Sequence, residues 1–220
     1  MRVAICDYGA GNVRSVELAF RRLGADVVDD AAGADLAVLP GVGSARSAMA
    51  ELRARGLDAV LRRRVREARP VLGICLGLQL ALEWTEEDGG VEGLALLPGR
   101  ALRLREGRVP RIGWAHVDAS AYYFAHSFAA ETAAVTAFSE GIVAEARAGS
   151  FVGVQFHPEK SGRAGARYLA RLLTELEQLS SRNSYRVAYE EQDASGNASG
   201  PGTWPERTRP VGAGGCRSRG

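Results

Sequence analysis

Apolar runs and amphipathic segments alternate along the first 84 residues, and this alternation constrains the fold more than any other feature. The apolar runs predict buried strands at 2–6, 35–39 and 71–74. Segments with the periodicity of helices follow them at 12–24, 44–54, 57–68 and 76–84. Strands that alternate with helices in this way predict a mostly parallel sheet covered by helices on both faces.

After residue 99 the pattern changes to strands with little helix between them. Strand-like segments lie at 100–105, 112–117, 122–128, 132–138, 142–146 and 151–156. We expect antiparallel pairing for these strands, which would extend the sheet and fold over one of its edges. With a last amphipathic helix at 162–179, the prediction is an α/β domain over residues 1–179, with added antiparallel strands in its C-terminal half.

The remaining residues, 180–220, are rich in Gly, Ser, Pro and Arg and have no apolar periodicity, so we expect a disordered tail. We interpret Cys216 in this tail as an incidental thiol. No apolar run is long enough to span a membrane, no signal-peptide pattern is present, and three widely spaced cysteines do not suggest disulfides. We therefore expect a cytoplasmic protein, and the net charge of +2 gives no indication of nucleic-acid binding.

One cysteine stands where acyl transfer needs a nucleophile. Cys75 follows the strand at 71–74 directly and lies between Gly73 and Gly77. Flanking glycines permit a strained turn from strand to helix, and the free N–H groups at the start of the helix favour the reactive thiolate. The alternative is a buried structural cysteine, which is our interpretation of Cys6 in mid-strand.

A histidine and a glutamate far down the chain complement this cysteine. His157 and Glu159 follow the strand at 151–156, and positions two apart in an extended chain point the same way. Glu159 can then accept a hydrogen bond from one ring nitrogen of His157 while the other nitrogen faces the thiol. His116 and His126 lie within predicted strands, and we expect neither to be the catalytic base.

A glycine-rich turn, Pro40-Gly41-Val42-Gly43, ends another predicted strand at the same edge of the sheet. The backbone N–H groups of Val42 and Gly43, together with that of Leu76, can stabilise a developing oxyanion. Without the cysteine this segment would read as an ordinary tight turn. Gly9-Ala10-Gly11 lacks the third glycine of a dinucleotide fingerprint and predicts no nucleotide site.

These segments together resemble the class I (triad) glutamine amidotransferases. The two motifs that carry the resemblance are Gly-Ile-Cys-Leu-Gly-Leu-Gln at 73–79 and Gln-Phe-His-Pro-Glu-Lys-Ser at 155–161. Similar segments at 7–12, 40–43, 111–114 and 122–127 extend the resemblance in order over residues 1–178. It implies a flavodoxin-like three-layer fold, no metal or organic cofactor, and hydrolysis of glutamine through a thioester on Cys75.

The resemblance also implies binding residues and a partner. Glutamine would be held by Gly43, Gln79, Glu87 and Ser127. Its ammonia would pass to a (β/α)8-barrel synthase subunit in a heterodimer, docked at Asn12, Trp114, Tyr123 and Lys160. Lys160 is the only lysine of the chain; it is either a chance survivor or a compact cation that pairs across the interface. Such enzymes show little activity until the partner rearranges the 40–43 strand.

Three departures from the family pattern concern the interface: Ala115 and Ala45 replace residues that are usually larger, and the 114–122 segment is short. Two alternatives remain. One is an amidotransferase subunit of another synthase, for aminobenzoate, guanylate or pyridoxal phosphate, against which Gly113-Trp114 and the 122–127 segment argue. The other is a catalytically silent, partner-binding relative, against which the intact Cys75, His157 and Glu159 argue.

Overall fold

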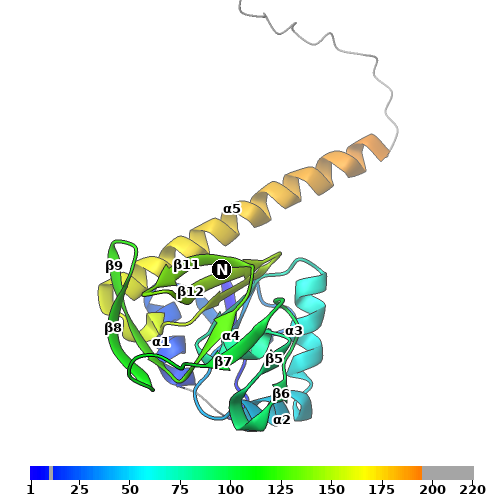
Figure 1. The fold of residues 1–220 in the computed structure, drawn as a ribbon. Helices are drawn as coiled ribbons and strands as arrows, with labels where there is room; N and C mark the ends of the chain where they lie inside the picture. The colour runs from blue at the N-terminus through cyan, green and yellow to red at the C-terminus, as the bar shows by residue number, and fades with distance from the viewer. Residues whose placement is uncertain (10–11, 195–220) are drawn as a thin grey trace, which may run out of the picture. The chain divides into compact units, whose positions relative to one another are not determined.

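The computed structural model describes residues 1–9 and 12–194 of the 220-residue chain, with side chains through residue 179. The chain divides into two units, residues 1–179, which form the folded body of Figure 1, and residues 180–220. Of the second unit, the structure describes the helical backbone of residues 180–194. The 195–220 part of the tail lies outside the described residues, so its predicted disorder stays a prediction.

The centre of the first unit is a seven-stranded sheet with the strand order β11-β12-β13-β4-β3-β1-β2. Its strands are β1 (Arg2–Ile5), β2 (Asp26–Val28), β3 (Leu36–Leu39), β4 (Val71–Ile74), β11 (Val135–Ser139), β12 (Ile142–Ala148) and β13 (Phe151–Val154). The five strands from β13 to β2 are parallel, and β12 and β11 add antiparallel pairing at one edge. The predicted architecture is therefore confirmed.

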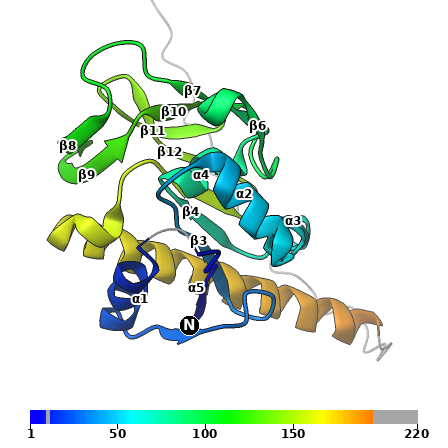
Figure 2. The same cartoon turned by 90° about the horizontal axis from the view of Figure 1, so that it is seen from below.

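Helices cover both faces of this sheet. They are α1 (Val13–Arg22), α2 (Ala45–Ala54), α3 (Leu57–Arg66), α4 (Leu76–Ala81) and α5 (Gly162–Ala194). Figure 2 shows α1 and α5 on one face and α2, α3 and α4 on the other. Successive strand residues alternate between two apolar cores: Val38 packs with Phe20 of α1, and Leu39 with Met49 of α2. Both faces are thus shielded from water, as a parallel sheet requires.

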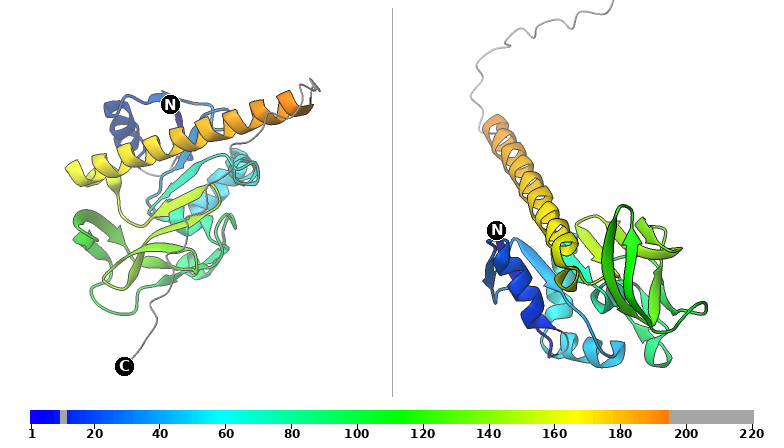
Figure 3. Two further views of the ribbon diagram at one scale, coloured as in Figure 1. Left: turned by 90° about the horizontal axis from the view of Figure 1, so that it is seen from above. Right: turned by 90° about the vertical axis from the view of Figure 1, so that its left-hand side faces the viewer.

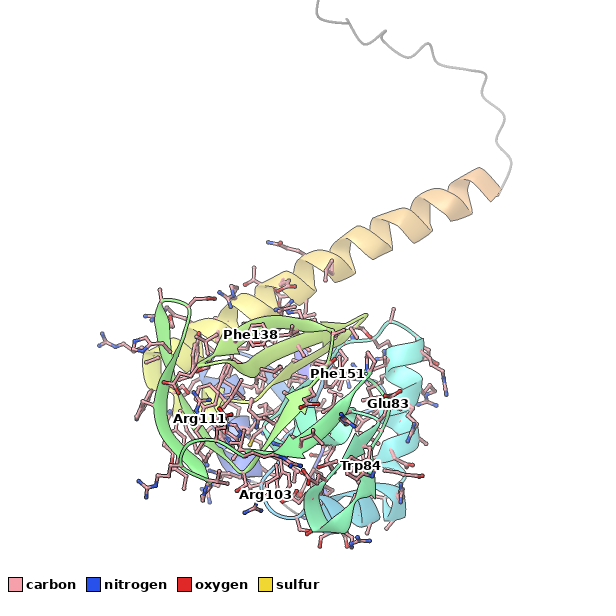
Figure 4. All side chains as sticks on the ribbon, viewed as in Figure 1. Glu83, Trp84, Arg103, Arg111, Phe138 and Phe151 are labelled. Atoms are coloured by element: carbon pink, nitrogen blue, oxygen red, sulfur yellow. The ribbon has the colours of Figure 1, made fainter. Side chains whose placement is uncertain are left out.

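Two smaller sheets flank the antiparallel edge. One has the order β10-β7-β5-β6 and the other is the hairpin β8-β9. Their strands are β5 (Trp84–Thr85), β6 (Val91–Glu92), β7 (Arg100–Arg103), β8 (Arg111–Val117), β9 (Ser120–His126) and β10 (Phe128–Glu131). The green segments of Figure 3 show this flank beside the blue and cyan half. Arg111 ties the hairpin to the β11–β12 turn by donating to Ser139 and Glu140, 2.9 Å each (Figure 4).

Some element boundaries differ from the prediction. The helix expected over 76–84 ends at Ala81, because Leu82 is extended and Trp84 pairs in β5. The strand expected over 122–128 is two strands, β9 and β10, that belong to different sheets. The last helix was expected to end at residue 179 but continues to Ala194. The stretch 180–194 lacks Gly and Pro, so its backbone can stay helical without an apolar face to bury.

A buried arginine, Arg64 of α3, holds the loop before β3. It has no exposed surface, and its guanidinium donates to the carbonyl oxygens of Ala31 (3.0 Å), Ala34 (2.9 Å), Asp35 (3.1 Å) and Pro70 (2.9 Å). Burial, together with the nearby Arg69, lowers the pKa of Arg64 to about 10, although Cys6 and two aspartates oppose this shift. The side chain therefore serves as a fixed set of donors for the loop before β3 and for the residue before β4.

We expect Arg64→Met to lower the free energy of unfolding by about 3 kcal/mol, because buried carbonyl groups lose their donors. Urea denaturation measures this change. Arg63→Met, an equivalent substitution at an exposed position of the same helix, is the control and should stay within about 0.5 kcal/mol of the parent. Equal effects of the two substitutions would contradict the role given to Arg64.

Candidate active site

Three adjacent parallel strands deliver the predicted site residues to one edge of the sheet. Leu39 at the end of β3 lies opposite Gly73 of β4, and Ile74 at the end of β4 lies opposite Val154 of β13. The Cys75 N–H continues this pairing by donating to Val154 O at 2.7 Å. The 40–43 turn, Cys75 and the 155–159 segment therefore emerge side by side, which is where open α/β sheets bind ligands.

Cys75 occupies a strained turn between β4 and α4. Its φ of 53° and ψ of −106° place a non-glycine residue at positive φ, and the residue is 5% exposed. The flanking glycines serve close packing rather than unusual dihedrals: a Cβ on Gly77 would lie 2.0 Å from Leu39 O, and one on Gly73 would lie 2.8 Å from backbone atoms of Gly77. The strain itself thus falls on the cysteine.

His157 and Glu159 form a buried pair. His157 Nδ1 lies 2.9 Å from Glu159 Oε1, and both side chains are 2% exposed. A carboxylate only accepts, so Nδ1 carries a proton, and Nε2 is buried without a hydrogen-bond partner among the described residues. Burial lowers the pKa of His157, but the nearby Cys75 thiol and the bond to Glu159 outweigh it and raise the pKa to about 9. Nε2 and the sulfur form no regular hydrogen bond in this structure, and it is the negative charge of a Cys75 thiolate that favours the imidazolium.

The hairpin β8-β9 holds the histidine segment in place. The His157 N–H donates to Tyr123 O at 2.8 Å, and Ser161 Oγ donates to His157 O at 2.6 Å while accepting from the Tyr123 N–H at 3.0 Å. The Tyr123 ring lies 6.4 Å from the His157 ring and 6.1 Å from the Trp114 ring. Two expected docking residues therefore contact the elements that position the candidate base.

The other expected docking residues are near this hairpin or on helix ends. Asn12 caps α1 by accepting from the Ser15 N–H, and α1 packs against the short turn η2 (Pro158–Lys160) that contains Lys160. Trp114 is 60% exposed and Ile112 is 59% exposed, so the outer face of β8 presents apolar surface. Whether these residues bind a partner stays a prediction.

The 40–43 turn is anchored against the cysteine. Tyr8 Oη donates to Pro40 O at 2.7 Å from a fully buried position. A Cβ on Gly41 would lie 2.5 Å from Leu76 Cβ, so the 40–43 segment packs directly on the turn that carries Cys75. Gly43 has a φ of +101°, a conformation that favours glycine. The geometry brings Val42, Gly43 and Leu76 together, and their action on an oxyanion stays a prediction.

A cavity of about 210 Å³ opens at this edge of the sheet. It is lined by Cys75, by the predicted glutamine-binding residues Gly43, Gln79, Glu87 and Ser127, and by Val42, Leu76, Pro110, Ile112, Ala125, His126 and Phe128. Drug-sized ligands usually occupy roughly 300–1,000 Å³, so a volume of this size suits an amino acid. All four predicted binding residues thus share one cavity with the candidate nucleophile.

Glu87 contributes a carboxylate to the cavity wall. Its Oε2 accepts from the Ala45 N–H at 3.1 Å, and the next residue, Asp88, accepts from Ser44 Oγ at 2.6 Å and from the Arg46 N–H at 3.0 Å. Burial raises the pKa of Glu87. The start of α2 therefore fixes this acidic turn from a distant part of the chain, and an ammonium group of a ligand would complement it.

His126 lines the same cavity but differs from His157. Its Nδ1 lies 2.9 Å from Phe128 O, which can only accept, so Nδ1 carries the proton. Burial, and the nearby Arg111 and His157, lower the pKa of His126 to about 4, although the bond to Phe128 opposes this shift. The ring is therefore neutral near pH 7 and is not oriented by a carboxylate, which agrees with the expectation that it is not the base.

The lowered pKa predicts acid sensitivity. His126 has an ordinary value of 6.5 when unfolded and about 4 when folded, so the unfolded chain binds the proton more tightly between these values. Stability should then fall by about 2–3 kcal/mol as the pH falls from 6.5 to 4. His126→Asn, which keeps a donor near the place of Nδ1 but does not titrate, should lack this component in urea unfolding.

An exposed histidine provides the control for this measurement. His116→Asn is the same substitution at an exposed position of β8, and its unfolding is followed over the same pH range. An unchanged acid sensitivity in the His126 variant would mean that other groups dominate this pH range.

Comparisons with known proteins follow this geometry. Residues 5–176 match the family described as "Glutamine amidotransferase class-I". The chain belongs to the class I glutamine amidotransferase family. A relative from Symbiobacterium thermophilum, named imidazole glycerol phosphate synthase subunit HisH, is 43% identical over 194 residues, which cover 77% of this chain and 92% of the relative. A HisH subunit from Methanothermobacter thermautotrophicus is 41% identical over 186 residues, 74% of this chain and 93% of that one.

Two further comparisons concern architecture. A crystal structure titled as a glutamine amidotransferase superposes with a TM-score of 0.65 at 22% identity, covering 79% of this chain and 97% of that one, and so shares the fold. In Arabidopsis thaliana, the chloroplastic imidazole glycerol phosphate synthase hisHF is 37% identical over 199 residues, which cover 78% of this chain but 34% of the plant protein. The plant protein therefore contains a long region beyond the amidotransferase-like part.

For this amidotransferase the described residues contain no group of three or more His, Cys, Asp or Glu side chains able to hold a metal ion. None of its described helices combines the length and apolar character needed to cross a bilayer. The sequence interpretation missed the role of Gln155, which is fully buried and contacts both Gln79 and Cys75. Its place in the second motif, two residues before His157, was the available signal.

Proposed function

We propose that this chain is the glutaminase subunit of an imidazole glycerol phosphate synthase in histidine biosynthesis. The observation that carries the proposal is the single cavity that joins Cys75 to every predicted glutamine-binding residue. The names of relatives that are about 40% identical over most of the chain support this particular synthase.

The proposed reaction begins with the Cys75 thiolate, which attacks the carboxamide carbon of glutamine. Backbone N–H groups of Val42, Gly43 and Leu76 stabilise the oxyanion. His157 donates its Nε2 proton to the departing ammonia, which leaves a glutamyl thioester on Cys75. The same nitrogen then takes a proton from water, and the resulting attack releases glutamate. Glu159 holds Nδ1–H throughout and stabilises the imidazolium, which the raised pKa of His157 favours.

The cavity wall complements the amino-acid end of glutamine. Glu87 supplies a carboxylate for the α-ammonium group, and Gln79 offers its Oε1 to the same group because its Nε2 already donates twice within the protein. Backbone groups near Gly43 and Ser127 bind the α-carboxylate. We therefore expect an amide that lacks the α-ammonium and α-carboxylate groups, such as acetamide, to be a poor substrate.

The partner of the proposed enzyme is a (β/α)8-barrel cyclase, HisF, in a heterodimer. The word "subunit" in the names of the relatives, and the long plant protein named hisHF, support a second component. Ammonia would pass from the cavity to this cyclase, which uses it on a phosphoribulosyl-formimino carboxamide ribotide to form imidazole glycerol phosphate and an aminoimidazole carboxamide ribotide. The exposed Trp114, beside Tyr123, provides apolar surface for docking.

Glutamate release, measured with and without a cognate cyclase subunit and its ribotide, tests this function. We expect hydrolysis that depends on the cyclase and that is strongest with the ribotide bound. A glutamine-mimicking electrophile should label Cys75 in the complex, and Cys75→Ala should abolish the label. Activity that requires a different synthase would assign the chain to another branch of the family, and labelling that survives Cys75→Ala would place the nucleophile elsewhere.

A further inference from the structure

Gln155 is a buried amide whose contacts reach the reacting atom. It follows β13 directly, is 0% exposed, and its Nε2 lies 3.5 Å from Cys75 Sγ. We propose that Gln155 is a further catalytic residue, which donates a hydrogen bond to the Cys75 sulfur and links it to Gln79 in the substrate cavity. The inference rests on the proposed function, since it deepens the account of the same nucleophile.

The direction of these hydrogen bonds follows from one backbone carbonyl. Phe128 O can only accept, so the atom of Gln79 that lies 2.7 Å from it must be the amide nitrogen. The same nitrogen lies 3.2 Å from Gln155, so the oxygen of Gln155 faces it. The nitrogen of Gln155 must then point to Cys75. Flipping either amide would place two donors or two acceptors against each other.

The sulfur therefore contacts one hydrogen-bond acceptor and one donor, which favour different protonation states of Cys75. The thiol can donate to Ala125 O at 3.8 Å, a contact that exists only while the proton is on sulfur. Gln155 donates to the sulfur in either state, and its bond becomes charge-assisted when the thiolate forms. Losing the thiol proton thus removes the bond to Ala125 and strengthens the bond from Gln155. Gln155 is thus a side-chain donor that favours the nucleophilic form, in addition to the positive charge of the His157 imidazolium.

The same chain of amides reaches the substrate. Both amide hydrogens of Gln79 are used, one by Phe128 O and one by Gln155 Oε1, which leaves only Oε1 of Gln79 as an acceptor for a ligand. A cation at Oε1 would polarise the Gln79 amide and strengthen its donation to Gln155. Because hydrogen bonds in series reinforce one another, the bond from Gln155 to the sulfur would strengthen as well.

Alkylation of the full-length chain by iodoacetamide tests the proposal without a partner protein or a ribotide. The rate is measured across a range of pH, with modification of Cys75 followed by peptide mass spectrometry. Gln155→Met keeps the side-chain length but removes both the donor and the acceptor. We expect the pH midpoint of alkylation to rise by about one to two pH units and the rate below the midpoint to fall roughly ten- to hundredfold. At high pH the rates should converge.

Convergence at high pH separates a donor to the thiolate from a purely structural role, which would change accessibility at every pH. Two titratable groups interact with Cys75, namely His157 and Tyr8, and both are unchanged in these variants. Gln178→Met, the same substitution on an exposed turn of α5, is the control and should leave the profile as in the parent. Gln155→Glu retains an acceptor for Gln79 but places a carboxylate at the sulfur, so the pH midpoint of alkylation should rise in this variant as well. It replaces Gln155→Met in the test if the methionine variant fails to fold.

The outcomes separate this inference from the proposed function. If Cys75 carries the label and neither Gln155 variant moves the midpoint, Gln155 does not support the thiolate and the inference is wrong, while the glutaminase proposal stands. If Cys75→Ala leaves the labelling by a glutamine-mimicking electrophile unchanged, the proposed nucleophile itself is wrong.

Discussion

Alanine at Cys75 or at His157 is expected to lower kcat for glutamine hydrolysis by roughly four to six orders of magnitude, and the double variant to lose no more than either single variant. In the proposed mechanism the sulfur forms the covalent bond and the imidazole moves every proton, so each residue is ineffective without the other. Both side chains are buried, so bulk water has little access to take over their roles. Glutamate release by the complex with its cyclase measures the loss.

Two controls accompany this prediction. Cys6→Ala changes a cysteine that is 1% exposed and directly follows β1. It should leave kcat within a factor of two or three of the parent, which corresponds to about 0.5 kcal/mol in activation free energy. The inactive complexes should still form product when ammonium salt replaces glutamine, because the cyclase needs only ammonia. A Cys75→Ala variant that hydrolyses glutamine at a tenth of the normal rate would refute covalent catalysis by this residue.

The second large effect concerns Gly41. An alanine there would place its Cβ 2.5 Å from Leu76 Cβ and 2.7 Å from Gly77 N. The 40–43 segment would therefore have to move away from the turn that carries Cys75. If the N–H groups of Val42 and Gly43 bind the oxyanion as proposed, their displacement should lower kcat roughly 100- to 1,000-fold, as the loss of one oxyanion donor does. Steady-state glutamate release with the cyclase and its ribotide measures the change.

Gly24→Ala is a matched control for Gly41→Ala. Gly24 has a φ of +80° but no atom within 4 Å of its missing Cβ, so alanine adds backbone strain far from the cavity without a steric clash. Its variant should lose about 1 kcal/mol of unfolding free energy with little change in kcat. If Gly41→Ala behaves in the same way, the close packing of the strand on the Cys75 turn does not contribute to catalysis.

Local sequence signals predicted the parts of the fold that depend on long periodic segments and on glycine spacing. Cys75 was recognisable because a cysteine that has a glycine on each side and directly follows an apolar run matches the strand-to-helix turn of a nucleophile. His157 and Glu159 were recognisable because an extended segment aligns them. These signals are local, and the parallel sheet brings them together because β3, β4 and β13 are neighbours.

The missed features depend on contacts between distant segments. The two-residue strands β5 and β6 and the three-residue strand β2 are too short for a periodic pattern, and exist because neighbouring strands pair with them. Gln155 is a polar residue at the end of an apolar strand, which by itself suggests a surface position. Its burial is compatible with folding only because Gln79 and Cys75, from another strand–helix turn, supply its hydrogen-bond partners.

The solitary lysine has a practical consequence. Lys160 lies three residues after His157, at the end of the short turn that begins with Pro158. Its backbone N–H donates to His157 O. Because every other basic side chain except histidine is an arginine, reagents selective for primary amines can react with this side chain and with the α-amino group alone. Cross-links from a bifunctional acylating reagent would thus start at one of two known points, and those that start at Lys160 would report how far a bound protein lies from the histidine turn.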